Sequence, residues 1–276
     1  MVASLSSSSD RQIKAQADFF AREGYVVAPG LFSAPEVAEV REIFARIHAE
    51  GIPGHYAARS EQDGVRSADD PLFDFPRVMM PHRHNDRAKY FMLHPRVVER
   101  LGAFFGQEPV ATQSMFYFKP PGARGQALHQ DQFYLLVEPG TCIAAWTAID
   151  DCDAENGAVL VVPKTNEAEV ICPKVADASV SYTSHLVPVP PGHKAKLVPM
   201  KAGDTLFFNG SIIHGSGPNR SKTRFRRAFI GHYAAGDVRK ISGGYRPLMR
   251  MDGTEYEVEA QSSGGPCGEG WKGALH

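Results

Sequence analysis

The chain has 276 residues, of which 43% are hydrophobic and 22% are charged, a composition that excludes a disordered chain and a membrane protein. Its 30 Lys and Arg residues are balanced by 31 Asp and Glu residues, so the net charge of -1 creates no field that attracts nucleic acid or an acidic membrane. We therefore expect a globular protein that binds a small molecule, either as a monomer or as a small homo-oligomer.

The N-terminal segment has neither the basic start nor the apolar core of a secretion signal, and the chain contains no run of about 18 apolar residues. These features predict a cytoplasmic protein. The cysteines form no CxxC pair and no dense framework, so we expect free thiols in a reducing compartment. They are Cys142, Cys152, Cys172 and Cys267.

The first hundred residues predict a layer of helices. Ser33 is followed three positions later by Glu36, the spacing of a capping box, and apolar residues then recur with the period of a helix. Two further helices are expected, at 11–22 before Gly24 and at 95–105 before Gly106.

From about residue 110 the chain changes to short β-rich runs that are separated by Gly, Pro, Asn or Asp. These runs are 110–119, 126–137, 141–149, 157–163, 196–200, 204–214 and 224–234. Many short strands at this spacing predict a sandwich or barrel, and the jelly roll is the version that commonly carries a metal at its open end.

We therefore expect a mainly β fold with flanking helices, whose core is a double-stranded β-helix (jelly roll, cupin-like). A chain of this length is at the upper end of what one hydrophobic core supports, so one domain is expected. It would comprise a helical N-terminal part at about 10–106, the jelly-roll core at about 108–236 and a C-terminal extension at 237–276.

The best candidate for a metal site is the pair His129 and Asp131. Residues two apart on a strand point to the same side, so a strand at 126–137 would aim both side chains into the mouth of the barrel. About one HxD or HxE match is expected by chance in such a composition, and three occur. The other two, at His48 and His84, lie in a helix and in a polar stretch, so only His129 with Asp131 lies in a predicted strand.

A third ligand is expected from a later strand, and His214 closes the apolar run TLFFNGSIIH. Two imidazoles and one carboxylate on one face of an octahedron make the iron site of oxygen-activating enzymes. A turn-rich stretch and a second strand follow, so we expect a hairpin in which Arg224 and Arg226 share one face. Arginine there can bind a dicarboxylate through its planar, permanently charged fork.

These motifs together resemble the phytanoyl-CoA dioxygenase family of iron and 2-oxoglutarate oxygenases. The resemblance rests on FKPPG (118–122) leading into HQD (129–131), on WTAIDDCDAENGAVLVVP (146–163), and on HGSGPN (214–219) followed by RRA (226–228). It implies an enzyme that uses Fe(2+), 2-oxoglutarate and O2 and that releases succinate and carbon dioxide. The presence of Asp131 favours hydroxylation or another oxidation over halogenation.

The resemblance also implies roles for individual residues. His129, Asp131 and His214 would ligate the iron, and Arg226 would bind the outer carboxylate of 2-oxoglutarate. A loop one residue longer than usual after His214 leaves Arg224 as an alternative. Further expectations are Ser216 as a donor to that carboxylate, Trp146 and Gln113 as lining of the cosubstrate pocket, and Lys119 as a charge at the end of a strand.

The substrate is not legible in the sequence. The stretch 75–89 resembles the family segment at the rim of the active site, and we expect Arg77 and His82 in it to contact the cosubstrate or a polar or anionic substrate. Two alternatives remain open at this point. One is a metal-dependent hydrolase or isomerase that uses the same ligands as a Lewis-acid site, and the other is a catalytically silent, cupin-like binding protein.

Overall fold

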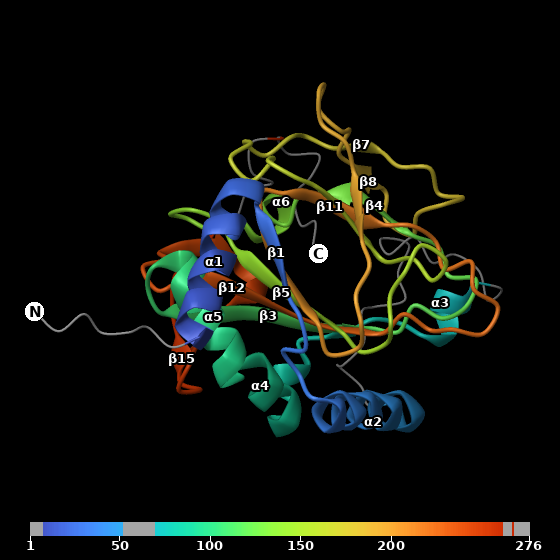
Figure 1. Ribbon diagram of the computed structural model, residues 1–276, viewed down its shortest axis with the longest axis horizontal. Helices are drawn as coiled ribbons and strands as arrows, with labels where there is room; N and C mark the ends of the chain where they lie inside the picture. Colours follow the sequence, from blue (N-terminus) through green and yellow to red (C-terminus); the bar gives the residue numbers. More distant parts are fainter. Residues whose placement is uncertain (1–7, 52–69, 262–266, 268–276) are drawn as a thin grey trace, which may run out of the picture.

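The computed structural model describes residues 8–51, 70–261 and residue 267, and most of its helices come early in the chain (Figure 1). The helices and 3-10 turns are α1 (Ser8–Glu23), α2 (Ala34–Glu50), α3 (Pro71–Asp74), η2 (Pro81–Arg83), α4 (Asp86–Met92), α5 (Pro95–Phe105), α6 (Gln132–Leu135) and η3 (Gly243–Tyr245). The three predicted N-terminal helices are therefore confirmed as α1, α2 and α5. The capping box of α2 is present, because the backbone N–H of Ser33 donates to Glu36 across 2.7 Å.

The strands form two principal antiparallel sheets. The strands of the large sheet, in spatial order, are β1 (Tyr25–Ala28), β10 (Thr205–Asn209), β5 (Ile143–Ala148), β12 (Ala228–Ala235), β3 (Pro109–Tyr117), β14 (Leu248–Arg250) and β15 (Glu255–Tyr256), with β2 (Val78–Met79) also paired to β3. The small sheet has the order β4 (Gln126–His129), β11 (Ile213–Ser216), β6 (Val159–Val162) and β9 (Lys196–Val198). Two short pairs complete the fold: β7 (Lys174–Val175) with β8 (His185–Leu186), and β13 (Lys240–Ser242) with β16 (Glu259–Gln261).

The predicted double-stranded β-helix with a helical layer is confirmed. The helices cover the outer face of the large sheet, and Figure 1 shows α1, α5, α4 and α2 along that side with β4 and β11 on the opposite side. In α2, Phe44 stacks on Phe116 of β3 with a centroid distance of 4.0 Å. The residue of β3 before Phe116, Met115, faces inward and packs with Trp146 and Ile230 between the two sheets. This alternation leaves the inner face of the large sheet for the functional site.

Two local predictions are wrong. Residues 126–137 do not form one strand, because β4 ends at His129 and α6 begins at Gln132. The strand of His214 and the strand after Arg226 do not form a hairpin either, since β11 pairs with β4 and β6 whereas β12 pairs with β3 and β5. The connection crosses from one sheet to the other instead.

Buried side-chain amides explain why the chain turns at these two places. Gln130 donates to the backbone oxygen of Ser211 across 2.7 Å and accepts from the N–H of Ile171 across 2.7 Å. Asn219 donates to the carbonyl oxygens of Lys119 and Arg224, at 3.1 and 2.7 Å. Each amide satisfies backbone groups that a continuous ladder would otherwise pair.

The expectation of four free thiols is also wrong. Cys172 and Cys267 form a disulfide with a Cα–Cα distance of 5.4 Å, whereas Cys142 and Cys152 are buried free thiols. The bridged cysteines are 95 residues apart, so no local spacing in the sequence indicates the pair. The described part of the C-terminal extension adds β14 and β15 to the large sheet, while 262–266 and 268–276 lie outside the described residues.

Across residues 8–51 and 70–261, none of the helices combines the length and the apolar composition that are needed to cross a membrane.

Candidate metal centre

Two histidines face each other on neighbouring strands of the small sheet. His129 is the last residue of β4, and His214 lies directly opposite it on β11 in the antiparallel register. Opposed residues of such a pair carry their side chains on the same face, a few ångströms apart. The two ring centroids are 4.2 Å apart, and both side chains are buried.

Asp131 reaches the same point from a turn. Its backbone is in the right-handed helical region, and its carbonyl accepts from the N–H groups of Tyr134 and Leu135 in α6. This turn points the carboxylate back at the histidines, so that Oδ1 lies 3.6 Å from His129 Nε2 and 3.4 Å from His214 Nε2. The candidate ligand atoms of the three residues all lie within 4.8 Å of one another.

Hydrogen bonds to backbone carbonyls fix the tautomer of both histidines. Nδ1 of His129 donates to Ala127 O across 2.8 Å, and Nδ1 of His214 donates to Ile212 O across 3.1 Å. A carbonyl oxygen only accepts, so each Nδ1 carries the hydrogen and each Nε2 presents its lone pair to the shared point. Gln126 donates its amide to His129 Nε2 across 3.2 Å, which agrees with that tautomer, and a bound metal would take the place of this donor.

A residue of the large sheet holds the carboxylate. Nε2 of His232, on β12, lies 2.9 Å from Asp131 Oδ2, and both side chains are almost fully buried. Oδ2 is thereby occupied, and Oδ1 is the oxygen that faces the two imidazoles. Two imidazole nitrogens and one carboxylate oxygen on one side, each oriented by a second hydrogen bond, are the donor set of non-haem iron(II) sites. The residues present therefore fit such a metal.

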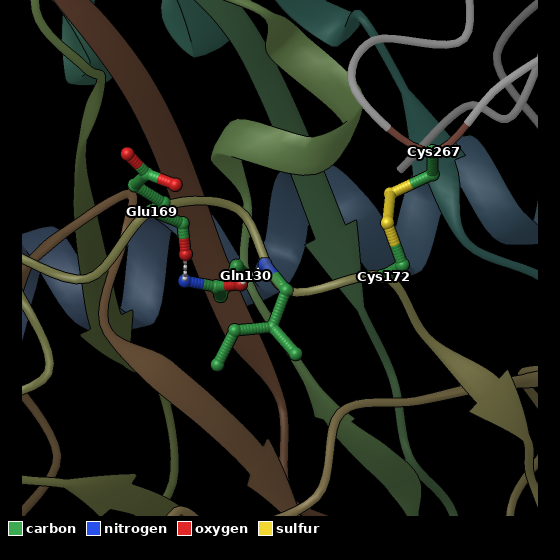
Figure 2. The surroundings of a disulfide bond; sticks show 5 residues. Gln130, Glu169, Cys172 and Cys267 are labelled. Atoms are coloured by element: carbon green, nitrogen blue, oxygen red, sulfur yellow. Dashed lines mark hydrogen bonds between the residues drawn. A yellow bond between two sulfur atoms is a disulfide. The ribbon is translucent and has the colours of Figure 1, made fainter.

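Gln130, between the two ligand candidates of the HQD motif, is attached to the segment that leads to the disulfide. Figure 2 shows its amide donating to the backbone oxygen of Glu169, a contact of 3.2 Å, close to the Cys172–Cys267 bond. The side chain of Gln130 is fully buried. The turn between His129 and Asp131 is thus held by Glu169 and Ile171, which lie 39 and 41 residues after Gln130.

A pocket opens beside the histidines, between the two sheets. The residues that line it come from the inner faces of both sheets: Met115, Tyr117, Gln126, Trp146, Val159, Phe208, His214, Gly215, Ser216, Arg226, Ile230 and His232. Four residues of the predicted site, Trp146, His214, Ser216 and Arg226, are among them.

Arg226 is buried in this pocket, only 5% exposed, and its guanidinium carbon lies 5.1 Å from the ring centroid of Trp146. Burial lowers the pKa of Arg226, but a guanidinium remains charged at physiological pH. Arg224 points elsewhere and forms ion pairs with Asp153 and Glu155, at 2.8 and 2.6 Å, with 38% of its side chain exposed. The geometry therefore favours Arg226 over the alternative.

The other predicted residues lie at the margin of the pocket or outside it. Gln113 is buried opposite His232 in the β3–β12 ladder. Arg77 donates to the hydroxyl of Tyr117, which lines the pocket, across 3.2 Å. His82 is bonded to the hydroxyl of Ser114 across 2.6 Å, and Ser114 faces away from the inner residues Gln113 and Met115 by strand alternation. The structure therefore does not bring His82 to the pocket.

Sequence reasoning missed three residues of this region. His232 could have been found by extending the alternation of Arg226, Ala228 and Ile230 by one further step. Gln126 carried no such signal, because its contact with His129 depends on the end of β4. Lys119 was interpreted as a charge at a strand end, but it is only 4% exposed.

Comparison with known proteins agrees with the donor set of this metal centre. The family model of phytanoyl-CoA dioxygenase (PhyH) matches residues 20–228. The peroxisomal phytanoyl-CoA dioxygenase of Rattus norvegicus is 28% identical over 82% of this chain and 70% of its own length. A probable phytanoyl-CoA dioxygenase of Caenorhabditis elegans is 30% identical over 83% of this chain and 68% of its own length.

Solved structures share the fold. The epimerase SnoN in complex with Fe3+, alpha ketoglutarate and nogalamycin RO superposes with a TM-score of 0.68 at 22% identity, over 86% of this chain and 87% of SnoN. EctD from S. alaskensis with 2-oxoglutarate and 5-hydroxyectoine gives a TM-score of 0.62 at 19% identity, over 82% of this chain and 77% of EctD.

Proposed function

Because the chain belongs to the phytanoyl-CoA dioxygenase family of iron(II)- and 2-oxoglutarate-dependent oxygenases, we propose that it oxidises an unactivated C–H bond of a small molecule and releases succinate and carbon dioxide. The observation that carries this proposal is the convergence of His129, Asp131 and His214 beside a pocket that contains a buried arginine. We take residues 1–276 as one catalytic domain.

In this proposal His129 and His214 hold the metal through Nε2 and Asp131 holds it through Oδ1. Bound there, iron(II) supplies the oxygen activation that drives decarboxylation of 2-oxoglutarate and oxidation of the substrate. The contribution of the protein is to orient these groups. Backbone carbonyls fix both imidazoles, and His232 fixes the carboxylate, so the three donor atoms are arranged before any metal enters.

The cosubstrate pocket would be completed by Arg226, Ser216 and Trp146. A guanidinium binds a carboxylate through two parallel hydrogen bonds, and in a buried pocket this interaction is little weakened by water. The ring of Trp146 lies against the guanidinium and adds a cation–π contact to it. Gln113 would support the same wall from β3. A metal hydrolase on the same ligands would have no use for this buried cation.

The substrate would enter past the tyrosines at the margin of the pocket. The charge of Arg77 lies 5.6 Å from the ring of Tyr117 and 5.7 Å from the ring of Tyr182, so Arg77 is our candidate for contact with a polar or anionic substrate group. His82 is a weaker candidate because Ser114 holds it on the other face of β3. The presence of Asp131 favours hydroxylation or a related oxidation over halogenation.

The test is anaerobic and needs no substrate. Iron(II) and then 2-oxoglutarate are added to the purified protein, and the visible charge-transfer absorption of the chelate is recorded. The expected result is a band in the wild type and no band in His129→Ala. An exposed histidine changed in the same way, His193→Ala, serves as the matched control and should keep the band. If the wild type binds iron(II) and 2-oxoglutarate produces no band, the proposed function is wrong.

A further inference from the structure

Lys119 is a buried cation behind the proposed cosubstrate pocket. It follows β3 in the FKPPG motif, and its Nζ donates to Ser216 Oγ across 2.9 Å and to the carbonyl oxygen of Gly217 across 2.5 Å. Both acceptors are neutral oxygen atoms, and a lysine is almost never buried in this way unless its charge is compensated. Lys119 does lie just after the end of a strand, as the sequence predicts, but it is buried there.

The protein places a second buried cation next to it. The backbone N–H of Arg226 donates to Lys119 O across 3.1 Å, which joins the end of β3 to the residues that precede β12. Burial lowers the pKa of Lys119 well below its ordinary value, and the positive charge of Arg226 lowers it further. Two buried cations in one part of the fold repel each other, and an anion bound in the pocket at Arg226 would relieve this repulsion.

The position of Lys119 is fixed by its surroundings. Asn219 donates to its carbonyl oxygen across 3.1 Å. The backbone of Gly157 packs against the aliphatic part of the Lys119 side chain, and its φ is +80°. A Cβ at position 157 would lie 3.0 Å from Lys119 Cε and 2.6 Å from Gly217 O. Only glycine leaves this space open and also adopts that backbone conformation readily. The slot that directs the ammonium group to Ser216 is therefore built into the fold.

The donor chemistry of the two side chains sets the direction of the Ser216 hydroxyl. While Lys119 carries its charge, its ammonium group only donates, so Ser216 Oγ accepts from it and must point its own O–H elsewhere. Ser216 lines the pocket together with Arg226 and His214. The open direction for this hydroxyl hydrogen is the pocket.

We propose that Lys119 is a positioning residue that turns the Ser216 hydroxyl towards the distal carboxylate of the 2-oxo acid and shares with Arg226 the positive charge that this carboxylate meets. This inference rests on the proposed function and extends it, because it predicts selectivity for a dicarboxylate. A 2-oxo acid without the distal carboxylate, such as 2-oxobutyrate, would gain nothing from Lys119.

The experiment compares the affinities of 2-oxoglutarate and 2-oxobutyrate for the anaerobic iron(II) protein, by titrating the charge-transfer band. Lys119→Met, which keeps the length of the side chain without its charge, should bind 2-oxoglutarate about tenfold more weakly and 2-oxobutyrate as the wild type does, since one charge-assisted hydrogen bond is lost. Lys119→Gln keeps a hydrogen-bond donor without the charge, so its affinity for 2-oxoglutarate should lie between those of the wild type and Lys119→Met. Lys201→Met, which removes an exposed lysine, is the matched control and should leave both affinities unchanged.

A double mutant distinguishes positioning from general damage. If Lys119 acts through Ser216, Lys119→Met should cost less 2-oxoglutarate affinity in a Ser216→Ala background than in the wild type, so the two effects should be less than additive. Wild-type affinity for 2-oxoglutarate in Lys119→Met, or an equal loss for both acids, would overturn this inference alone. Absence of the band in the wild type would instead overturn the proposed function, and this inference with it.

Discussion

Nε2 of His232 donates to Oδ2 of Asp131 across 2.9 Å, so a residue in the middle of the large sheet orients a carboxylate that belongs to the turn after β4. This hydrogen bond links the two sheets at the metal centre. It also leaves Oδ1 as the oxygen that faces both imidazoles.

His232→Phe should weaken iron(II) binding by about 10- to 100-fold, the usual cost of losing a partner that orients a metal ligand. His232→Gln should recover part of this affinity, because its amide can still donate to the carboxylate. Competition with a chelator of known affinity measures the effect. Equal affinities in His232→Phe and the wild type would show that the orientation of Asp131 does not depend on His232.

The two arginines that the sequence left as alternatives should behave differently. Arg226→Ala should weaken 2-oxoglutarate binding by about a hundredfold or more, because a buried charge-assisted contact to the carboxylate is lost. Arg224→Ala removes a half-exposed pair with Asp153 and Glu155 and should change that affinity less than twofold. Titration of the charge-transfer band gives both values. A larger loss in Arg224→Ala than in Arg226→Ala would reverse the assignment.

The convergence of the three ligand candidates was predictable, but its cause was not. Histidine and aspartate two positions apart, followed by a distant histidine, indicated the correct set. The expected mechanism was alternation along one strand, whereas Asp131 returns to the histidines through the turn at Gln130. That turn depends on backbone groups of Ile171 and Ser211, far along the chain, and no local pattern reports such contacts.

Helix ends and strand runs were predicted well because their signals are local. Capping residues and apolar periodicity defined α1, α2 and α5. Pairing partners are a non-local property, so β11 and β12 were expected to form a hairpin and instead belong to different sheets. The same limit applies to the disulfide between Cys172 and Cys267, which no spacing rule indicates.

Reduction of the disulfide should lower stability without removing the metal centre. The bond closes a loop of 95 residues, for which chain entropy gives an upper estimate of about 4 to 5 kcal/mol. We expect a lower midpoint of urea unfolding for the wild type in reductant, and no effect of reductant on a variant with both Cys172→Ser and Cys267→Ser. Iron(II) affinity should change little, because Gln130 keeps its bond to Ser211 O. A reductant effect of similar size in the double variant would assign the change to other groups.

His82 should make the protein sensitive to acid. Burial, followed by the charges of Arg83, Lys89 and His84, lowers the pKa of His82 to about 3, whereas an unfolded chain gives a histidine a pKa near 6.5. The unfolded state therefore binds a proton first as the pH falls. The stability that neutral His82 provides is complete above about pH 6.5 and is lost progressively between that pH and about pH 3, by about 1.4 kcal/mol per pH unit.

The measurement is urea unfolding at pH 7.5 and pH 5.0. In His82→Gln the loss of stability between these two values should be smaller than in the wild type by about 2 kcal/mol, although the variant is less stable at pH 7.5 because it loses the bond to Ser114. His193→Gln replaces an exposed histidine and should keep the wild-type dependence on pH. Equal pH dependence in His82→Gln and the wild type would place the acid sensitivity in other buried groups.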